Sequence, residues 1–180
     1  VNNTYGLKVT IPDDSVVRDK ITGTNEDGSS KLPIKIHATG NFDATNIRIA
    51  LQRRIYGNDK ENDDDVYNLE YEDVDLLNFF TEEYGILGTD NTSLTQNTFV
   101  PCSDTDMLDY YVIDNYNAFV ETNGVDEFIL DMSMKNNTST GWKTGTYRVV
   151  VSIYDGSTLI GKTYQYIFIS NKSVLNTEIK

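Results

Sequence analysis

Short stretches in which apolar and polar residues alternate constrain the fold of this 180-residue chain more than any other feature. Successive side chains of a β-strand point to opposite faces, so alternation predicts a strand with one buried and one solvent-facing side. The pattern occurs in six stretches, at about 7–11, 32–39, 47–55, 128–135, 146–154 and 159–169. Between the last two, Asp155-Gly156-Ser157 has the residues of a tight turn and predicts a β-hairpin.

Six strands with one polar face each favour antiparallel sheets that stack on one another. Helical spacing is confined to the long stretch between the third and fourth strands, where Val74–Tyr84 and a short segment after Ser103 are predicted helices. A further strand is expected at Val66–Tyr71. We therefore predict an all-β fold, a single domain over 1–180, with a long, partly helical insertion at about 58–126.

Three segments carry a resemblance to a known family: Leu32–Ile36 as a second strand, Asn46–Leu51 as a third, and Gly141–Val149 as the approach to the penultimate strand. In the last, Tyr147 stands where a tyrosine corner would pin the chain. The chain resembles an antiparallel immunoglobulin-like or fibronectin type III-like β-sandwich of about seven strands. Such modules recur in multi-domain surface proteins of Gram-positive bacteria. The resemblance implies an extracellular place, on the cell surface or secreted, beside neighbouring domains of a longer chain.

Net charge narrows the possible partners. The chain has 15 basic and 28 acidic residues and a net charge of −13, which repels the phosphates of nucleic acids and anionic lipids. No apolar run approaches the roughly 18–20 residues of a membrane span. The sequence has one Cys and one His, Cys102 and His37, which permit neither an internal disulfide nor a His-rich metal site. His37 is expected to face outward from a strand, and we predict that the protein is not an enzyme.

An acidic stretch is the most unusual local feature. Acidic residues at alternate positions, with a further Glu near the end, partly match a calcium-binding loop, whose hard cation takes six to eight oxygens. The candidate metal ligands are Asp59, Glu61, Asp63, Asp65 and Glu70. The alternative is a solvated acidic loop whose charges repel one another. We expect no obligatory cofactor, with calcium as the one candidate.

A second candidate site combines aromatic rings with amide groups. Aromatic rings can stack on sugar faces, and amides can bind sugar hydroxyls. The alternative is structural, because tyrosine also fits the partly solvent-exposed faces of sheets. The candidate ligand-binding residues are Tyr110, Tyr111, Asn115, Tyr116, Asn117 and Trp142. Of these, Trp142 lies in a loop before the Tyr147 strand, where closing the end of the sandwich is the alternative role.

These patterns favour a non-enzymatic structural or adhesive module of a bacterial cell-surface or secreted protein. It would contact a host or cell-wall protein or glycan through the insertion, because recognition normally lies in loops carried by a rigid scaffold. The alternative is a carbohydrate-binding module stabilised by calcium. A third hypothesis is a hydrolase that uses carboxylates of the insertion.

Overall fold

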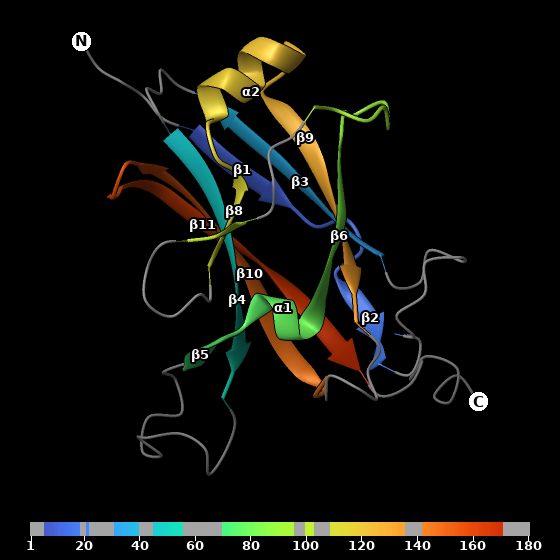
Figure 1. Ribbon diagram of the computed structural model, residues 1–180. Coiled ribbons are helices and arrows are strands. Elements are labelled where there is room, and N and C mark those ends of the chain that lie inside the picture. The colour runs from blue at the N-terminus through green and yellow to red at the C-terminus, as the bar shows by residue number, and fades with distance from the viewer. Residues whose placement is uncertain are drawn as a thin grey trace.

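The computed structural model describes residues 6–18, 21, 31–39, 45–55, 70–95, 100–102, 109–135 and 142–170 (Figure 1). Within these ranges the chain forms two sheets and two short helices. One sheet has four strands, in the order β1 (Gly6–Thr10), β3 (Lys31–Thr39), β9 (Glu127–Met134) and β6 (Phe80–Leu87). The other has seven: β2 (Ser15–Val17), β11 (Thr158–Ser170), β10 (Gly145–Asp155), β4 (Thr45–Arg54), β8 (Tyr110–Ile113) and β7 (Val100–Pro101) in order, with β5 (Tyr71–Val74) beside β4. The predicted all-β fold is confirmed.

The strand order is that of an immunoglobulin-like sandwich. Taken along the chain, β1, β3, β4, β6, β9, β10 and β11 occupy the places of strands A to G, with A, B, E and D in one sheet and C, F and G in the other. All pairings are antiparallel except that of β2 with β11. The four additional strands, β2, β5, β7 and β8, all join the second sheet, which is therefore the larger one.

The predicted alternation identifies the residues that form the core. On β3 the side chains of Leu32, Ile34 and Ile36 are fully buried, and Lys35 between them is exposed. The same holds for the apolar face of β4 and for Val149 on β10. Each buried methylene stabilises the folded state by about 0.8 kcal/mol, so these facing surfaces hold the two sheets together.

The predicted hairpin joins β10 to β11. Gly156 adopts a φ of 61° and Ser157 does not have a positive φ, which is the pattern of a two-residue type II′ turn. A Cβ at a first turn position with positive φ is strained, which is why glycine stands there. The turn pairs Asp155 with Thr158, and an irregularity between Ile153 and Tyr154 then shifts the register by one residue, so that Arg148 lies opposite Tyr166.

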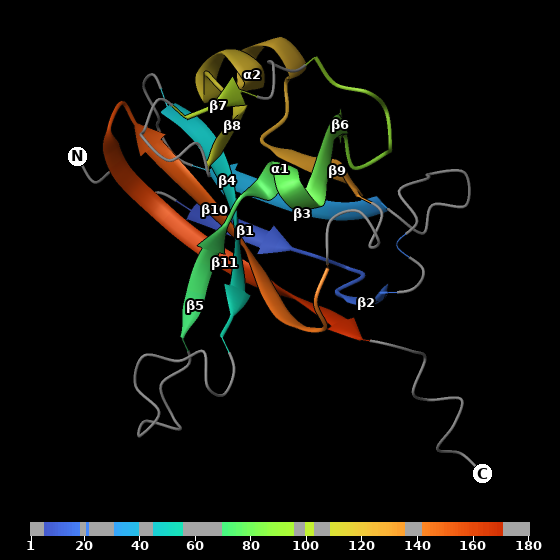
Figure 2. The ribbon, with the colours of Figure 1, turned by 60° about the horizontal axis from the view of Figure 1, so that its bottom comes forward.

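The described part of segment 58–126 is built into both sheets and is not an excursion outside them. β6 pairs with β9, whereas β5 and β8 both pair with β4. The helix predicted at Val74–Tyr84 is corrected: α1 covers only Leu76–Phe79, and the chain then continues as β6 (Figure 2). Strand pairing with β9 supplies backbone hydrogen bonds there and overrides the helix-like spacing of the apolar residues. Of the strand expected at Val66–Tyr71, residues 66–69 lie outside the described ranges, and Tyr71 is the first residue of β5.

A second helix, α2 (Tyr116–Asn123), lies at the end of the sandwich beside β3 and β9 (Figure 1). The helix predicted after Ser103 is wrong where the structure describes it, because Tyr111 belongs to strand β8; residues 103–108 lie outside the described ranges. Neither helix is long and apolar enough to cross a membrane.

Candidate functional site

The solvent-facing side of the larger sheet carries a group of aromatic side chains around an arginine, here called the aromatic face. Its members are Tyr71 on β5, Arg148 on β10, and Tyr164, Tyr166 and Phe168 on β11. The three residues of β11 share one side of the strand, since they alternate along it. Neighbouring ring centroids are 5.6 and 6.2 Å apart along β11, and the Tyr71 ring lies 6.4 Å from that of Tyr166. Tyr164 and Phe168 are 41% and 43% exposed.

Arg148 lies between two of these rings. Its guanidinium carbon is 3.9 Å from the centroid of Tyr71 and 4.4 Å from that of Tyr164. Its Nε donates a hydrogen bond to Oε1 of Gln52 at 2.6 Å, and Nε2 of Gln52 donates to Asp73 at 2.8 Å. The cation thus holds the rings of two strands in place through its face and is oriented through one of its N–H groups.

A second arginine, Arg48 on β4, forms a similar arrangement farther along the same face. Its guanidinium carbon is 3.8 Å from the ring centroid of Tyr154 and 5.0 Å from that of Tyr111. Its Nε donates to the side chain of Asn46 at 2.8 Å, and one terminal nitrogen donates to the carbonyl of Gly156 at 3.2 Å. This side chain is only 6% exposed, so it ties the β10–β11 turn to β4.

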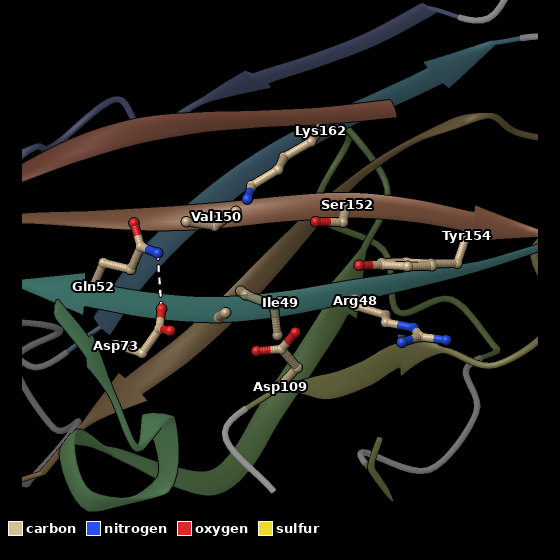
Figure 3. Close-up of a pocket in the computed structure, with 10 residues that line it drawn as sticks. Arg48, Ile49, Gln52, Asp73, Asp109, Val150, Ser152, Tyr154 and Lys162 are labelled. Atoms are coloured by element: carbon tan, nitrogen blue, oxygen red, sulfur yellow. Dashed lines mark hydrogen bonds between the residues drawn. The ribbon is translucent and has the colours of Figure 1, made fainter. Parts of the chain in front are cut away.

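A polar depression of about 170 Å³ lies in the middle of this face (Figure 3). Ala50, Val150 and Ser152 are small or buried and form its floor. Its walls come from four strands and the residue before β8: Arg48, Gln52, Asp73, Asp109, Tyr154 and Lys162. Amide, carboxylate, hydroxyl and ammonium groups therefore meet around one hollow, and Gln52 connects it to Arg148.

The outer face of the four-stranded sheet differs in chemistry. Lys35 and Glu127 form an ion pair at 2.8 Å, and Lys31 lies 3.6 Å from Asp131. Hydrogen bonding from Lys35 lowers the pKa of the Glu127 carboxyl below its ordinary value. His37 faces outward on the same side, as predicted. Cations and anions pair within this face, so it presents a solvated surface, whereas the larger sheet presents rings.

Three of the predicted ligand-binding rings are covered by protein. Tyr110, Tyr116 and Trp142 are buried, which corrects the expectation that they are open to a ligand. The Trp142 ring packs on the rings of Phe79, Phe80 and Tyr147, at centroid distances of 4.7, 5.8 and 5.2 Å. It closes one end of the core.

Tyr116 has a structural role at the opposite end. Its hydroxyl donates to the carbonyl of Ala38 at 2.7 Å and lies 3.0 Å from that of Asp126. Burial, and next the negative charge of Asp126, raises the pKa of this phenol. Its ring and Asn117 line a hollow of about 300 Å³ between α2 and the end of β3.

The remaining predicted residues divide between two roles. Asn115 is the N-cap of α2, where its side chain accepts a hydrogen bond from the backbone N–H of Ala118 at 3.1 Å. Of the six candidates, Tyr111 is the one that the structure places on the larger sheet's outer face, beside Arg48. The structure therefore does not bring the six together at one surface.

The predicted metal ligands Asp59, Glu61, Asp63 and Asp65 lie outside the described residues, and Glu70 is half-buried next to β5. Within the ranges that the structure describes, no group of three or more His, Cys, Asp or Glu is placed to hold a metal ion. Cys102 is a free, buried cysteine.

The aromatic face was missed at the sequence level, and the signal was present only in part. Alternation places Tyr164, Tyr166 and Phe168 on the polar side of the last strand, which marks them as exposed rings. Their meeting with Arg148 and Tyr71 depends on strand register over long separations in the sequence, which alternation does not specify.

Neither protein-family models nor curated protein sequences match this chain. Among solved structures, it is similar to BcpA, the major pilin subunit of Bacillus cereus, with a TM-score of 0.41 and 9% identity over 94% of this chain and 40% of the pilin. It is also similar to a conjugative transposon lipoprotein from Bacteroides eggerthii, with a TM-score of 0.33 and 10% identity over 91% of this chain and 95% of the lipoprotein. A third similar structure is AggA, the major subunit of aggregative adherence fimbriae type I from Escherichia coli. Its TM-score is 0.33, with 10% identity over 94% of this chain and 97% of AggA. The chain thus spans 40% of the length of the pilin, and its fold is assigned from its own strand order and register.

Proposed function

We propose that this chain is a non-enzymatic adhesive or structural module of a bacterial cell-surface or secreted protein, and that its contact surface is the aromatic face. The observation that carries the proposal is the exposure of Tyr164 and Phe168 on one side of β11, with Tyr166 between them. Clustered exposed rings mark interaction sites on soluble proteins. Tyrosine and arginine are also enriched among the few residues that carry most of the binding energy at protein contacts.

The scaffold beneath the aromatic face supports this role. Arg148 is on β10, which pairs along its length with β4 on one side and β11 on the other. A contact residue on the middle of a sheet keeps its geometry better than one on a loop. The ordering cost of binding is therefore small for these side chains.

The segment 58–126 takes part in the proposed contact. It supplies Tyr71 to the aromatic face and Tyr111 to the neighbouring Arg48 arrangement. The contact surface is thus shared between this segment and the hairpin formed by β10 and β11. A host or cell-wall protein or glycan is the proposed partner, and the bacterial surface setting follows from the resemblance carried by 32–36, 46–51 and 141–149.

A bead-adhesion assay tests the proposal. Beads coated with the protein are washed over mucin, fibronectin and insoluble peptidoglycan, and retained beads are counted. We expect retention on at least one surface and a loss of tenfold or more with Tyr164→Ser combined with Phe168→Ser. Leu159→Ser is the control, since Leu159 is an equally exposed apolar residue near the hairpin turn. Retention on none of the three, or equal retention with the double variant, contradicts the proposal.

A carbohydrate-binding module is the second proposed function, and the polar depression beside the aromatic face favours it. Saccharide hydroxyls need polar partners such as Gln52 and Ser152, and sugar rings stack on exposed aromatic side chains. Calcium bound by the acidic stretch at 59–70 remains part of this second proposal.

A further inference from the structure

Arg148 on β10 makes fewer polar contacts through its terminal nitrogens than Arg48 and Arg53 on the adjacent strand β4. Arg53 forms an ion pair with Glu72, and Arg48 donates to Asn46 and Gly156. Arg148 uses its Nε on Gln52, and within the described ranges its terminal nitrogens have no hydrogen bond and no carboxylate partner. Guanidinium N–H groups are strong donors, so an external acceptor would gain charge-assisted hydrogen bonds here.

The rings around Arg148 determine the direction from which an acceptor can approach. Tyr71 and Tyr164 stack on its guanidinium at 3.9 and 4.4 Å. All five N–H groups of a guanidinium lie in its plane, so stacking leaves their directions open. The open edge is a fork of donors, which matches the two oxygens of a carboxylate.

The depression next to Arg148 adds hydroxyl recognition. Gln52 borders both, because it accepts from Arg148 and also lines the hollow with Ser152 and Lys162 (Figure 3). A ligand held by its carboxylate on Arg148 can therefore place polar groups in the hollow and an apolar ring face on Tyr164. The ring of an acidic sugar bears a carboxylate, hydroxyl groups and an apolar face together.

Net charge selects among acidic ligands. The chain carries −13, so a dense polyanion is repelled by the molecule as a whole. An acidic saccharide with one carboxylate per otherwise neutral ring is less densely charged than such a polyanion, and one of its carboxylates gains the short-range bonds of Arg148. We propose that the aromatic face and the depression bind an acidic saccharide, a uronic or sialic acid unit, through its carboxylate. This inference rests on the proposed function, since it assigns a ligand class to the same surface.

The test is an NMR titration of the isotopically labelled protein with four probes: trigalacturonic acid, an α2,8-linked sialic acid trimer, maltotriose and triglutamate. We expect saturable shifts of the Arg148 Nε–H and the Gln52 amide with one of the two acidic trisaccharides. Which of them binds distinguishes the uronic from the sialic source. We expect maltotriose and triglutamate to bind at least tenfold more weakly.

Two substitutions of Arg148 locate the binding group. Arg148→Gln removes the charge and Arg148→Lys keeps it without the planar fork, and we expect both to weaken binding at least tenfold. Lys8→Gln changes the net charge equally on the outer face of the other sheet and is expected to leave affinity within twofold. Native-like spectra establish that the variants fold. If Arg148→Gln does not fold, the affinity of Arg148→Lys alone tests whether Arg148 binds the carboxylate.

Binding of maltotriose or triglutamate that is as tight as that of the acidic trisaccharide overturns the inference. Wild-type affinity in Arg148→Lys, or no shift with either acidic trisaccharide, also overturns it. In each of these cases the bead assay separates the two proposals. If adhesion depends on Tyr164 and Phe168, the proposed contact surface stands and only the acidic saccharide is rejected as its ligand. If adhesion is the same without these two side chains, the proposed contact surface is rejected as well.

Discussion

The hydroxyl of Tyr147 is bonded to both backbone polar groups of Lys143. It donates to the Lys143 carbonyl at 2.9 Å and accepts from the Lys143 N–H at 3.0 Å. Tyr147 is fully buried near the start of β10, four residues after its partner. This is the tyrosine corner that the sequence resemblance predicts, and it fixes the chain where it enters the central strand that carries Arg148.

Replacing Tyr147 with Phe keeps the ring packed but leaves the backbone groups of Lys143 without this partner. We expect a loss of about 1–2 kcal/mol in the free energy of unfolding, measured by urea denaturation. Tyr164→Phe is the matched control, because within the described residues the Tyr164 hydroxyl makes no hydrogen bond. Its expected change is below about 0.5 kcal/mol. Equal losses for both variants would contradict the role of the corner.

The two asparagines at the start of α2 are expected to behave differently. Asn115→Ala removes the N-cap acceptor of the Ala118 N–H and should destabilise the protein by about 1 kcal/mol. Asn117→Ala changes a residue inside the first turn and should cost little or improve helix propensity. Thermal unfolding of the pair distinguishes the cap from a general intolerance of substitution.

Alkaline pH should reveal the two buried phenols. Burial raises the pKa of Tyr147 and of Tyr116 above the ordinary value of about 10. A raised pKa in the folded state gives stability that is fully present below the unfolded pKa and is lost as pH rises through the folded pKa. The free energy of unfolding should therefore decline above about pH 10. The decline should be smaller in Tyr116→Phe; an unchanged slope in that variant would argue against a buried phenol.

Much of the fold follows from local pattern. Leu32, Ile34 and Ile36 are inward and Lys35 outward because alternation and strand geometry share a period of two. The position of Tyr147 near the start of a strand predicts its role as a tyrosine corner. These predictions depend on neighbours along the chain, and the structure confirms them.

The predictions fail where contacts between residues far apart in the sequence determine the local structure. Leu76 and Phe80 have helical spacing, yet Phe80 starts a strand because β9 offers an edge to pair with. The sequence neighbourhood of Tyr116 is rich in amides and rings and therefore suggests a ligand site. Its burial depends on the distant Ala38 carbonyl, which no local pattern reveals.

Calcium separates the two interpretations of the acidic stretch at 59–70. A cation that binds only the folded protein raises Tm. At a calcium concentration one hundred times Kd, it adds about 2.7 kcal/mol to the free energy of unfolding. A solvated loop gives no such rise. We expect Tm in millimolar calcium to equal Tm in a chelator, because charge repulsion without a completed ligand set favours a solvated loop. A rise that Asp63→Asn abolishes would establish the calcium site instead.

Hydroxyl-radical footprinting of the protein on the surface that retains it tests the contact surface most directly. We expect the oxidation of Tyr164, Tyr166 and Phe168 to fall severalfold on binding, and the oxidation of Tyr71 to fall with it. Oxidation of His37 on the outer face of the other sheet should stay unchanged. Protection of His37 with unchanged oxidation of the three β11 rings would contradict the account.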